Sequence, residues 1–448
     1  MPRKLKQEQK TISSRFIFLS FLGKIVLLSA FFSGICQAEE QFSFDLEEFE
    51  KKPLEWGGYA ELKWDHTKIN NNSVFSQLNL ADNSDSTLDQ YSGTLQFDGS
   101  YTVNNSTFNW LLQASGSQDD IGWYDTADVF EAYASLKPTP VVTISLGKKS
   151  YKWGKGYAWN PVGFLNRPKD PNNPEESLEG FITAEADLVK SYTGDLQTVA
   201  LTAVALPVGE YFNEDFGEYH NVDLAAKLYL LYRDTDIDFL FLSGNSRSER
   251  YGFDFSKNLA TNFEIHGELA YVPDQKQITI QNDGSLLSKE VSAFSSLLGI
   301  RYLTENDITS IIEYYHNGGG YSEEELEGFY QLISDGNTRF NETGLDDQLN
   351  TARQLSLQGY SRPQPGQDYL YARITKKDPF DILYLTPGIT AIYNLGDESI
   401  SLSPEIAYTG VTNWEFRLRF TYLDGKSFTE FGEKLNSNKV ELRIRFFF

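Results

Sequence analysis

Cysteine is almost absent from this sequence of 448 residues, and the one cysteine lies near the N-terminus. The first residues are basic, and residues 16–35 form a largely apolar run. Cys36 then begins a small-x-small tripeptide that ends at Ala38. This three-part pattern is typical of a secretory signal peptide, so we expect residues 1–38 to be cleaved off. A membrane anchor is the alternative, but Lys24 cuts the apolar run short. The mature chain would then have no disulfide.

Basic residues and histidines are also few. The chain has 39 Lys and Arg against 63 Asp and Glu, a net charge of −24. Loss of residues 1–38 would remove six basic residues and one acidic residue, which leaves 33 against 62 and a net charge of −29. Nucleic acids need a basic surface, so we expect no nucleic-acid partner. None of the four histidines has an obvious Ser or carboxylate partner in the sequence: His66, His220, His266 and His316.

Long apolar runs are missing after residue 38, and segments with a helical period are rare. The dominant pattern has a period of two instead. In residues 91–103, for example, one face is apolar or aromatic and the other carries Ser, Thr, Gln and Asp. Similar alternation recurs at 54–65, 108–115, 222–233, 263–271, 414–422 and 438–448. Such alternation predicts strands with one face in an apolar medium and the other in water.

Two features favour a membrane barrel over a soluble β-sandwich. Aromatic residues lie on the apolar face near both ends of a strand, 8 to 10 residues apart: Trp56 and Trp64, Tyr91 and Tyr101, Trp414 and Tyr422. At ~3.3 Å per residue and a tilt of ~40°, this separation spans roughly 20–25 Å, close to the height of a lipid-facing band between aromatic girdles. Tight links also alternate with long ones, which we expect at 148–181, 272–291 and 316–367 among others.

The fold class that these patterns predict is all-β. We expect a closed antiparallel transmembrane β-barrel of about 18 strands (16–18) over residues 54–448, with short helices in one long outer loop. The acidic residues 39–53 are expected to form a periplasmic N-terminal segment.

The last strand alternates to the end of the sequence, with one apolar face: Val440, Leu442, Ile444, Phe446 and Phe448. A closed barrel has no free edge, so its last strand must pair with its first. This ending resembles the terminal signature of Gram-negative outer-membrane β-barrels, which their assembly machinery reads. With the leader and the girdles, residues 54–448 resemble the porin-type barrel superfamily. The resemblance implies the outer membrane of a Gram-negative bacterium, contact with lipid and lipopolysaccharide, and the barrel-assembly machinery as a partner; it leaves a homo-oligomer open.

The water-facing side of the first and last two strands is rich in basic residues. This basic ladder consists of Lys63, Arg417, Arg419, Lys439, Arg443 and Arg445. In general porins, wall arginines face acids on a loop folded into the lumen, so the resemblance implies a constriction or a path that attracts anions. The alternative is ordinary polar lining, in which the ladder is salt-bridged to neighbours such as Glu61, Glu415 and Glu441.

Residues 152–171 are the least strand-like stretch, with glycines and prolines that demand special backbone angles. Its aromatic residues suggest an ordered loop, either folded into the barrel or packed at the rim. The candidate constriction residues are Trp153, Tyr157, Trp159, Asn160, Arg167 and Asp170. The Trp-Gly followed by Asn-Pro resembles an element of large uncharacterised outer-membrane barrel families. Gly154 and Gly156 are not a nucleotide-binding loop, since no βαβ unit follows.

The long link at 316–367 has the clearest helical periods. Ser322 and Glu325 form a capping box, after which apolar residues recur at helical spacing, and residues 345–355 repeat the pattern. These helices could act as a lid or lie on the rim. Glu264, His266 and Glu268 share one face of a strand, but three collinear side chains about 6.7 Å apart converge poorly on one ion. We therefore expect no metal and no cofactor.

The sequence thus predicts a porin-like channel for passive diffusion of small hydrophilic or anionic solutes through a loop-constricted lumen. We expect no enzyme activity and no catalytic residues. Two alternatives stay open: an export or lipid-transport barrel that works with a periplasmic partner, and an outer-membrane barrel enzyme.

Overall fold

The computed structural model describes residues 52–79, 86–119, 122–280 and 286–448. Within these residues, eighteen strands form one antiparallel sheet. The expected leader (1–38) and almost all of the expected periplasmic segment (39–53) lie outside them, so both stay predictions. In the part of the chain that is described, no helix is both long and apolar enough to cross a membrane.

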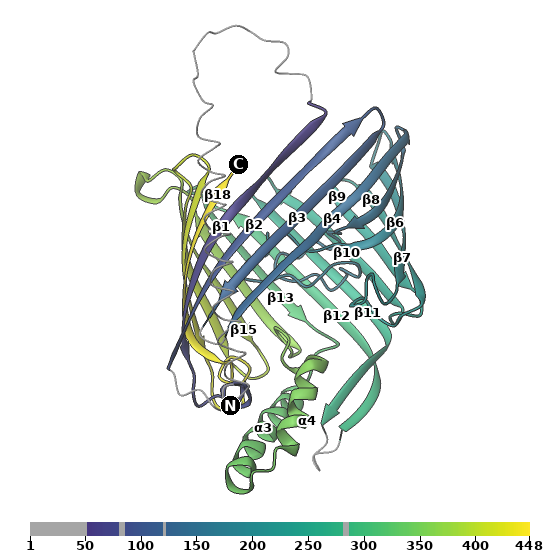
Figure 1. Ribbon diagram of the computed structural model, residues 1–448. Helices are drawn as coiled ribbons and strands as arrows, with labels where there is room; N and C mark the ends of the chain where they lie inside the picture. Colours follow the sequence, from purple (N-terminus) through teal and green to yellow (C-terminus); the bar gives the residue numbers. More distant parts are fainter. Residues whose placement is uncertain (1–51, 80–85, 120–121, 281–285) are drawn as a thin grey trace, which may run out of the picture. The chain divides into compact units, whose positions relative to one another are not determined.

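The sheet closes on itself (Figure 1). β1 (Leu54–Ile69) pairs with β18 (Asn436–Phe447), with Trp64 opposite Leu442. One residue past the end of β18, Phe448 exchanges two backbone hydrogen bonds of 3.1 and 3.2 Å with Gly58 of β1. All consecutive strands along the chain, from β1 to β18, also pair with each other. The predicted closed antiparallel β-barrel of about 18 strands is therefore confirmed.

The remaining strands run in chain order around the barrel. They are β2 (Thr87–Val103), β3 (Ser106–Gln118), β4 (Trp123–Thr139), β5 (Val142–Lys149), β6 (Phe181–Ser191), β7 (Leu196–Val208), β8 (Asn221–Tyr232), β9 (Thr235–Ser243), β10 (Arg250–Ala260), β11 (Phe263–Ile280), β12 (Leu286–Leu303), β13 (Ile308–His316), β14 (Asp368–Lys376), β15 (Leu385–Asn394), β16 (Ile400–Tyr408) and β17 (Trp414–Asp424).

The two faces of the barrel have opposite chemistry. Large apolar side chains are exposed on the outer face, for example Leu62 (56%) and Leu298 (61%), and Tyr91 and Tyr101 at either end of β2 are exposed as the girdles predict. Charged side chains such as Glu313 and Asp254 are buried on the inner face. This inside-out distribution suits a barrel that is surrounded by lipid.

The long link expected at 272–291 is wrong. β11 continues to Ile280 and β12 begins at Leu286, and the two strands stay paired over these described residues, with a register shift between Val272 and Gln275. Polar and charged residues here interrupt the apolar face, since this hairpin extends past the other strands to one end of the barrel (Figure 1). In β11 and β12, the alternation of apolar and polar residues therefore ends where the apolar outer band ends, although the strands themselves continue.

The predicted helices lie at the same end of the barrel (Figure 1). α3 (Glu323–Thr343) begins with the expected capping box between Ser322 and Glu325, and α4 (Asp347–Leu355) follows. A short helix in the β1–β2 link, α2 (Val74–Asn79), was not predicted. One apolar cluster joins α2, α3 and α4 with Ile278 and Ile280 of the β11–β12 hairpin. The helices are thus packed at the rim. A π-turn, η2 (Ser356–Tyr360), follows α4, and a 3-10 turn, η3 (Pro379–Asp381), precedes β15.

Candidate functional site

Residues 150–180, between β5 and β6, have no helix or strand and contact inward side chains around the barrel wall. We call this segment the inward loop. Its residues reach β9 and β10 through Lys155, β11 and β13 through backbone N–H groups, β17 through Asn172 and Asn173, and β18 through Glu176. The loop expected at 148–181 is therefore folded into the barrel.

Glu268 of β11 binds the loop through both carboxylate oxygens. Oε1 accepts the backbone N–H groups of Lys155 and Gly156, each at 2.6 Å, and the side-chain amide of Asn160 at 2.8 Å. Oε2 accepts the backbone N–H of Val162 at 3.2 Å. Glu268 is 1% exposed, and four donors offset the cost of burying its charge. Asn160, a candidate constriction residue, thus holds the loop to the wall.

Glu313 of β13 makes a second contact of the same kind. Its two oxygens accept the backbone N–H groups of Tyr157 at 2.5 Å and Ala158 at 2.9 Å, and its Oε1 lies 2.9 Å from Nε2 of His266. The Tyr157 hydroxyl donates to Glu264 at 3.3 Å. The expected inward face of Glu264, His266 and Glu268 thus anchors the loop.

Apolar contacts complete this side of the lumen. Trp159 stacks on Tyr315 of β13 at 5.0 Å between ring centroids and meets Tyr371 of β14 edge-on at 5.8 Å. Trp153 is buried, 4% exposed, in a cluster with Val162, Phe164 and residues of β6–β9. Lys169 donates to the carbonyl of Gly156 at 2.9 Å, and burial lowers the pKa of its ammonium. We call β9–β14 the closed side of the lumen.

Arg167 and Asp170 stabilise different parts of the inward loop. Arg167 lies over the Phe181 ring at 4.7 Å and pairs with Glu179 at 3.2 Å and with Asp215. Asp170 accepts from the backbone N–H of Asn172 at 2.9 Å and the side chain of Asn173 at 3.0 Å. Arg167 therefore fixes the loop near β6, while Asp170 shapes the turn that faces β17.

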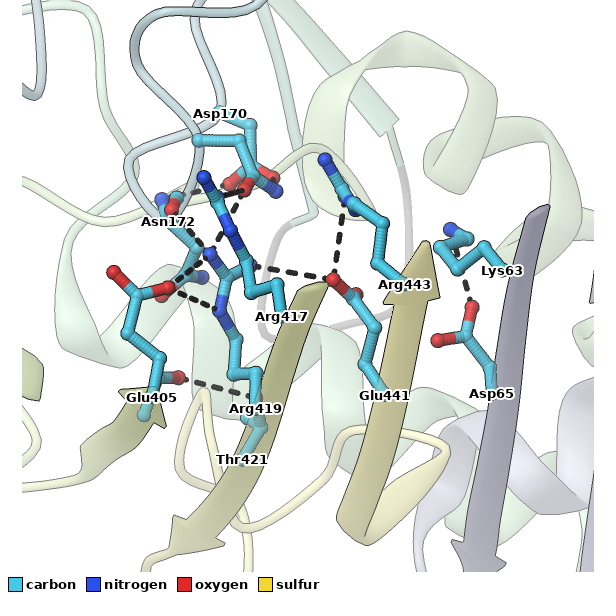
Figure 2. A network of polar contacts seen from close by, with 12 residues as sticks. Lys63, Asp65, Asp170, Asn172, Glu405, Arg417, Arg419, Thr421, Glu441 and Arg443 are labelled. Atoms are coloured by element: carbon cyan, nitrogen blue, oxygen red, sulfur yellow. Dashed lines mark hydrogen bonds and ion pairs between the residues drawn. The ribbon is translucent and has the colours of Figure 1, made fainter. Parts of the chain in front are cut away.

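The basic ladder lies on β1, β17 and β18, and Figure 2 shows four of its members, Lys63, Arg417, Arg419 and Arg443. Arg419 donates to Glu405 at 2.6 Å, to the Asn172 carbonyl at 3.0 Å and to the Asn173 side chain at 2.8 Å. Arg443 pairs with Glu176 of the loop at 2.7 Å and with Glu441 at 3.2 Å. The arginines thus hold the second half of the inward loop.

Every member of the ladder has a carboxylate partner. Arg445 pairs with Glu61 at 2.6 Å, Arg417 with Glu415 at 3.0 Å, and Lys63 with Asp65 at 3.2 Å. Lys439 lies 3.4 Å from Glu441 and 3.6 Å from Asp65. The contacts of the ladder therefore match the second interpretation, in which its basic residues are part of a polar lining and form salt bridges with neighbouring acids. The most exposed side chains of the six are those of Lys439 (30%) and Lys63 (26%).

Among the cavities that described residues line, four lie along β15–β18 and β1–β8. The short-turn cavity, about 580 Å³, is lined by Glu55, Gln96, Asp98 and Glu131 among others. The middle cavity, about 380 Å³, is lined by Tyr59, Glu61, Ser92, Ser115 and Arg445 among others. The loop-end cavity, about 330 Å³, is lined by Asp170, Asn172, Arg419 and Lys439 among others. The side cavity, about 500 Å³, is lined by Lys149, Lys152, Trp153, Glu185 and Lys227 among others. We call β17, β18 and β1–β5 the open side.

Two residues of the inward loop join these cavities. Glu176 lines the loop-end, middle and side cavities, and Ser177 lines the short-turn, middle and side cavities. Neither was among the candidate constriction residues, of which Trp153 and Asp170 each line one cavity. The acids Glu175, Glu176 and Glu179, in a loop expected to face wall arginines, were the available signal, whereas the predicted constriction residues were chiefly aromatic or polar.

The terminal strand lies as predicted. Val440, Leu442, Ile444 and Phe446 of β18 pair with residues of β1 opposite them, and Phe448 continues the pairing at Gly58. Their role as an assembly signal stays a prediction.

Three histidines have carboxylate partners that are not obvious from the sequence. His66 lies 2.9 Å from Asp89, its direct cross-strand neighbour, and His316 lies 2.8 Å from Asp368 in the same relation. His266 reaches Glu313 two strands away. Cross-strand register creates these pairs, so spacing along the chain hides them. Among the described residues, no group of three or more His, Cys, Asp or Glu is arranged to hold a metal ion.

Comparison with known proteins places the fold. No protein-family model matches the sequence, and no curated protein matches it. The chain is similar to the solved structure of OccK11 (OpdR) from Pseudomonas aeruginosa, with a TM-score of 0.50, 11% identity and coverage of 88% of this chain and 95% of that one. A triple mutant of the Rhodopseudomonas blastica porin aligns over 88% of this chain and all of its own, with a TM-score of 0.41 and 10% identity. This chain has the porin-type barrel fold. At these identities the likeness concerns the fold alone.

Proposed function

We propose that this barrel is a porin-like channel of the Gram-negative outer membrane through which small hydrophilic solutes diffuse passively. The observation that carries the proposal is the set of four cavities on and beside the open side, which share Glu176 and Ser177 and are lined largely by polar side chains. Lining of this kind can replace the hydration of a polar solute. The apolar outer face and the porin-type fold support the location in a membrane.

The proposed path follows the wall from end to end. The short-turn cavity begins at Glu55, near the start of β1, the middle cavity spans Tyr59 to Lys63, and the loop-end cavity reaches Asn436 and Lys439 beside the far end of β1. We propose that the inward loop constricts this path at Glu176 and Ser177. The closed side, where carboxylates and aromatic rings hold the loop, would carry no solute.

The solutes are proposed to be small and hydrophilic, with at most a weak preference for anions. The sequence pattern alone favoured anionic solutes because of the six basic residues. Each of them has a carboxylate partner, so their fields are largely compensated. Lys63 and Lys439, the most exposed of the six, would supply what preference remains.

Planar-bilayer recording tests the proposal. Purified, refolded protein is expected to give stepwise current increments, and liposomes that contain it are expected to swell in small sugars at rates that fall with sugar size. A folded barrel that inserts into the bilayer but conducts no ions and admits no sugar would contradict the proposal.

A further inference from the structure

The link between β14 and β15, residues 377–384, is unlike the other links at the same end of the barrel. The other seven links from an even-numbered strand to the next strand lie within the described residues and have two to five residues each, whereas this one has eight. Most of them are polar, such as Asn104 and Asn105 between β2 and β3. We call residues 377–384 the apolar turn, because four of its large apolar side chains are exposed: Phe380 (91%), Ile382 (48%), Leu383 (64%) and Tyr384 (60%).

The backbone of the apolar turn is fixed by hydrogen bonds to both neighbouring links. The N–H of Lys377 donates to the carbonyl of Asp307 in the β12–β13 link at 3.2 Å, and the N–H of Thr409 in the β16–β17 link donates to the carbonyl of Tyr384 at 3.1 Å. Four residues other than glycine have φ between 48° and 65°, which costs energy for a residue with a side chain: Asp378, Phe380, Asp381 and Tyr384. The turn therefore holds its apolar side chains outward on a defined backbone.

The apolar turn continues the apolar outer surface of the barrel. Ile374 of β14 and Ile389 of β15 are direct cross-strand neighbours, and both are exposed on the outer face. The turn follows them at the end of the barrel where β18 ends, and Figure 1 shows it as a yellow-green loop that projects sideways from the wall. A loop that projects sideways meets the leaflet around the barrel. The turn thus lies where the hydrocarbon band of a membrane passes into its headgroups.

The charges around the apolar turn suit phospholipid headgroups. Lys376 ends β14 on the same face as Ile374, and Lys377 follows it. Asp378 and Asp381 balance these two lysines, so residues 376–384 have no net charge. Equal numbers of both charges match zwitterionic headgroups, and a lysine can reach a phosphate while its stem stays in apolar surroundings.

We propose that the apolar turn anchors the barrel in the phospholipid leaflet at this end, an inference that rests on the proposed location in the outer membrane. Phe380, Leu383 and Tyr384 enter the boundary between headgroups and acyl chains, and Lys376 and Lys377 bind lipid phosphates. In the expected orientation, the end with the short links faces the periplasm, so the turn binds the periplasmic leaflet. The lipid beside the barrel covers an apolar patch that on a water-soluble surface would mark a protein partner.

Site-directed spin labelling tests the inference on the full mature barrel in phosphatidylcholine vesicles. The only cysteine, Cys36, lies in the expected leader, so Leu383→Cys gives a single labelling site. Oxygen concentrates among acyl chains and a nickel chelate stays in water, so the two collision rates report depth. We expect the label at residue 383 to collide more with oxygen than with the chelate, as at Leu298→Cys in the outer band. The matched control, Glu305→Cys in the neighbouring β12–β13 link, is exposed and should show the reverse.

The variant Phe380→Ser with Tyr384→Ser tests whether the apolar side chains hold the turn in lipid. We expect the label at residue 383 to lose its preference for oxygen and to behave like the label at residue 305. The matched control, Phe380→Leu with Tyr384→Phe, keeps two apolar side chains and should keep the preference. A label at residue 298 shows in each variant that the barrel itself is folded and inserted.

A label at residue 383 that meets the chelate as often as the label at residue 305 would overturn the inference. A label that is in water in these vesicles but shielded in native outer membranes would overturn it too, because a protein partner would then cover the turn. So would a serine variant that keeps its label among the acyl chains. These outcomes leave the channel function intact, since bilayer recordings of the same barrels test conductance separately, and absence of conductance would sink only the proposed function.

Discussion

The closed and open sides of the lumen hold the same inward loop in opposite ways. On the closed side, the wall supplies acceptors: Glu268 and Glu313 bind backbone N–H groups of residues 155–162. On the open side, the wall supplies donors: Arg419 and Arg443 bind side chains and a carbonyl of residues 172–176. The first kind of contact binds backbone groups among buried side chains, and the second leaves charged side chains beside the polar cavities of the open side.

The difference depends on two glycines of the inward loop. Gly154 has φ +100°, and a Cβ there would lie 2.7 Å from Oε1 of Glu268. A Cβ on Gly156 would lie 2.1 Å from the carbonyl oxygen of Trp159. Glycine at both places lets consecutive N–H groups converge on one carboxylate, as in anion-binding backbone nests. The Trp-Gly-Lys-Gly stretch is therefore a carboxylate-binding turn whose anion is part of the barrel wall.

The largest effect is expected when the closed side loses its main acceptor. Glu268→Ala leaves the N–H groups of Lys155, Gly156 and Val162 without a partner, at a cost of roughly 1–3 kcal/mol for each donor that water does not reach. We expect a lower melting temperature in detergent. Single-channel recordings should show higher and noisier conductance, because the freed loop opens the closed side.

Glu268→Gln is the informative partner variant, since it keeps one acceptor oxygen and should give an intermediate loss. Glu398→Ala removes an exposed carboxylate that pairs with Lys426 at 3.2 Å and should change neither stability nor conductance measurably. If Glu268→Ala folded with wild-type conductance and noise, the closed side would not depend on this contact.

The second-largest effect concerns how accessible the open and closed sides are to a reagent in water. The sequence has one cysteine, Cys36, in the expected leader, so the mature barrel suits single-cysteine labelling. Ser177→Cys places a thiol where three cavities meet, and a bulky water-soluble thiol reagent should block most of the current. Ala158→Cys, at a side chain that is fully buried on the closed side, should resist the reagent. Equal block of both variants would contradict the assignment of open and closed sides.

The sequence predicted the barrel well and the path through it poorly. Alternation and the aromatic girdles predicted the strand number and the outward faces, because neighbouring residues of a strand face lipid and water in turn, as Leu62 and Lys63 do. An ordered loop was also foreseeable from Trp153 and Trp159, which are poor choices for a solvated loop, but the sequence left open whether this loop folds into the barrel or packs at the rim. The role of Glu268 was hidden, because its partners are backbone N–H groups more than one hundred residues away and carry no side-chain signature. Part of the ladder's pairing was foreseeable, because Lys63–Asp65 and Arg417–Glu415 lie two residues apart on one strand. The pair Arg419–Glu405 depends on the register of β16 and β17, which no local pattern encodes.

The smallest effect in this series concerns the ladder itself. Arg417→Ala with Arg443→Ala removes two positive charges and leaves Glu415 and Glu176 without their arginine partners. Because these acids now act on the path uncompensated, we expect the reversal potential in a KCl gradient to shift toward cation selectivity. Glu176 is 46% exposed, so water screens its charge and the shift should be modest.

Arg417→Lys with Arg443→Lys is the matched control, since it keeps the charges but loses the forked geometry with which a guanidinium binds two partners. This variant should keep the wild-type reversal potential while it loosens the second half of the inward loop, which higher current noise would reveal. Comparison of the alanine and lysine double variants distinguishes the effect of the arginine charges from the effect of holding the inward loop. An unchanged reversal potential in the alanine pair would mean that solutes do not pass beside β17 and β18, and the open side would have to be sought elsewhere on the wall.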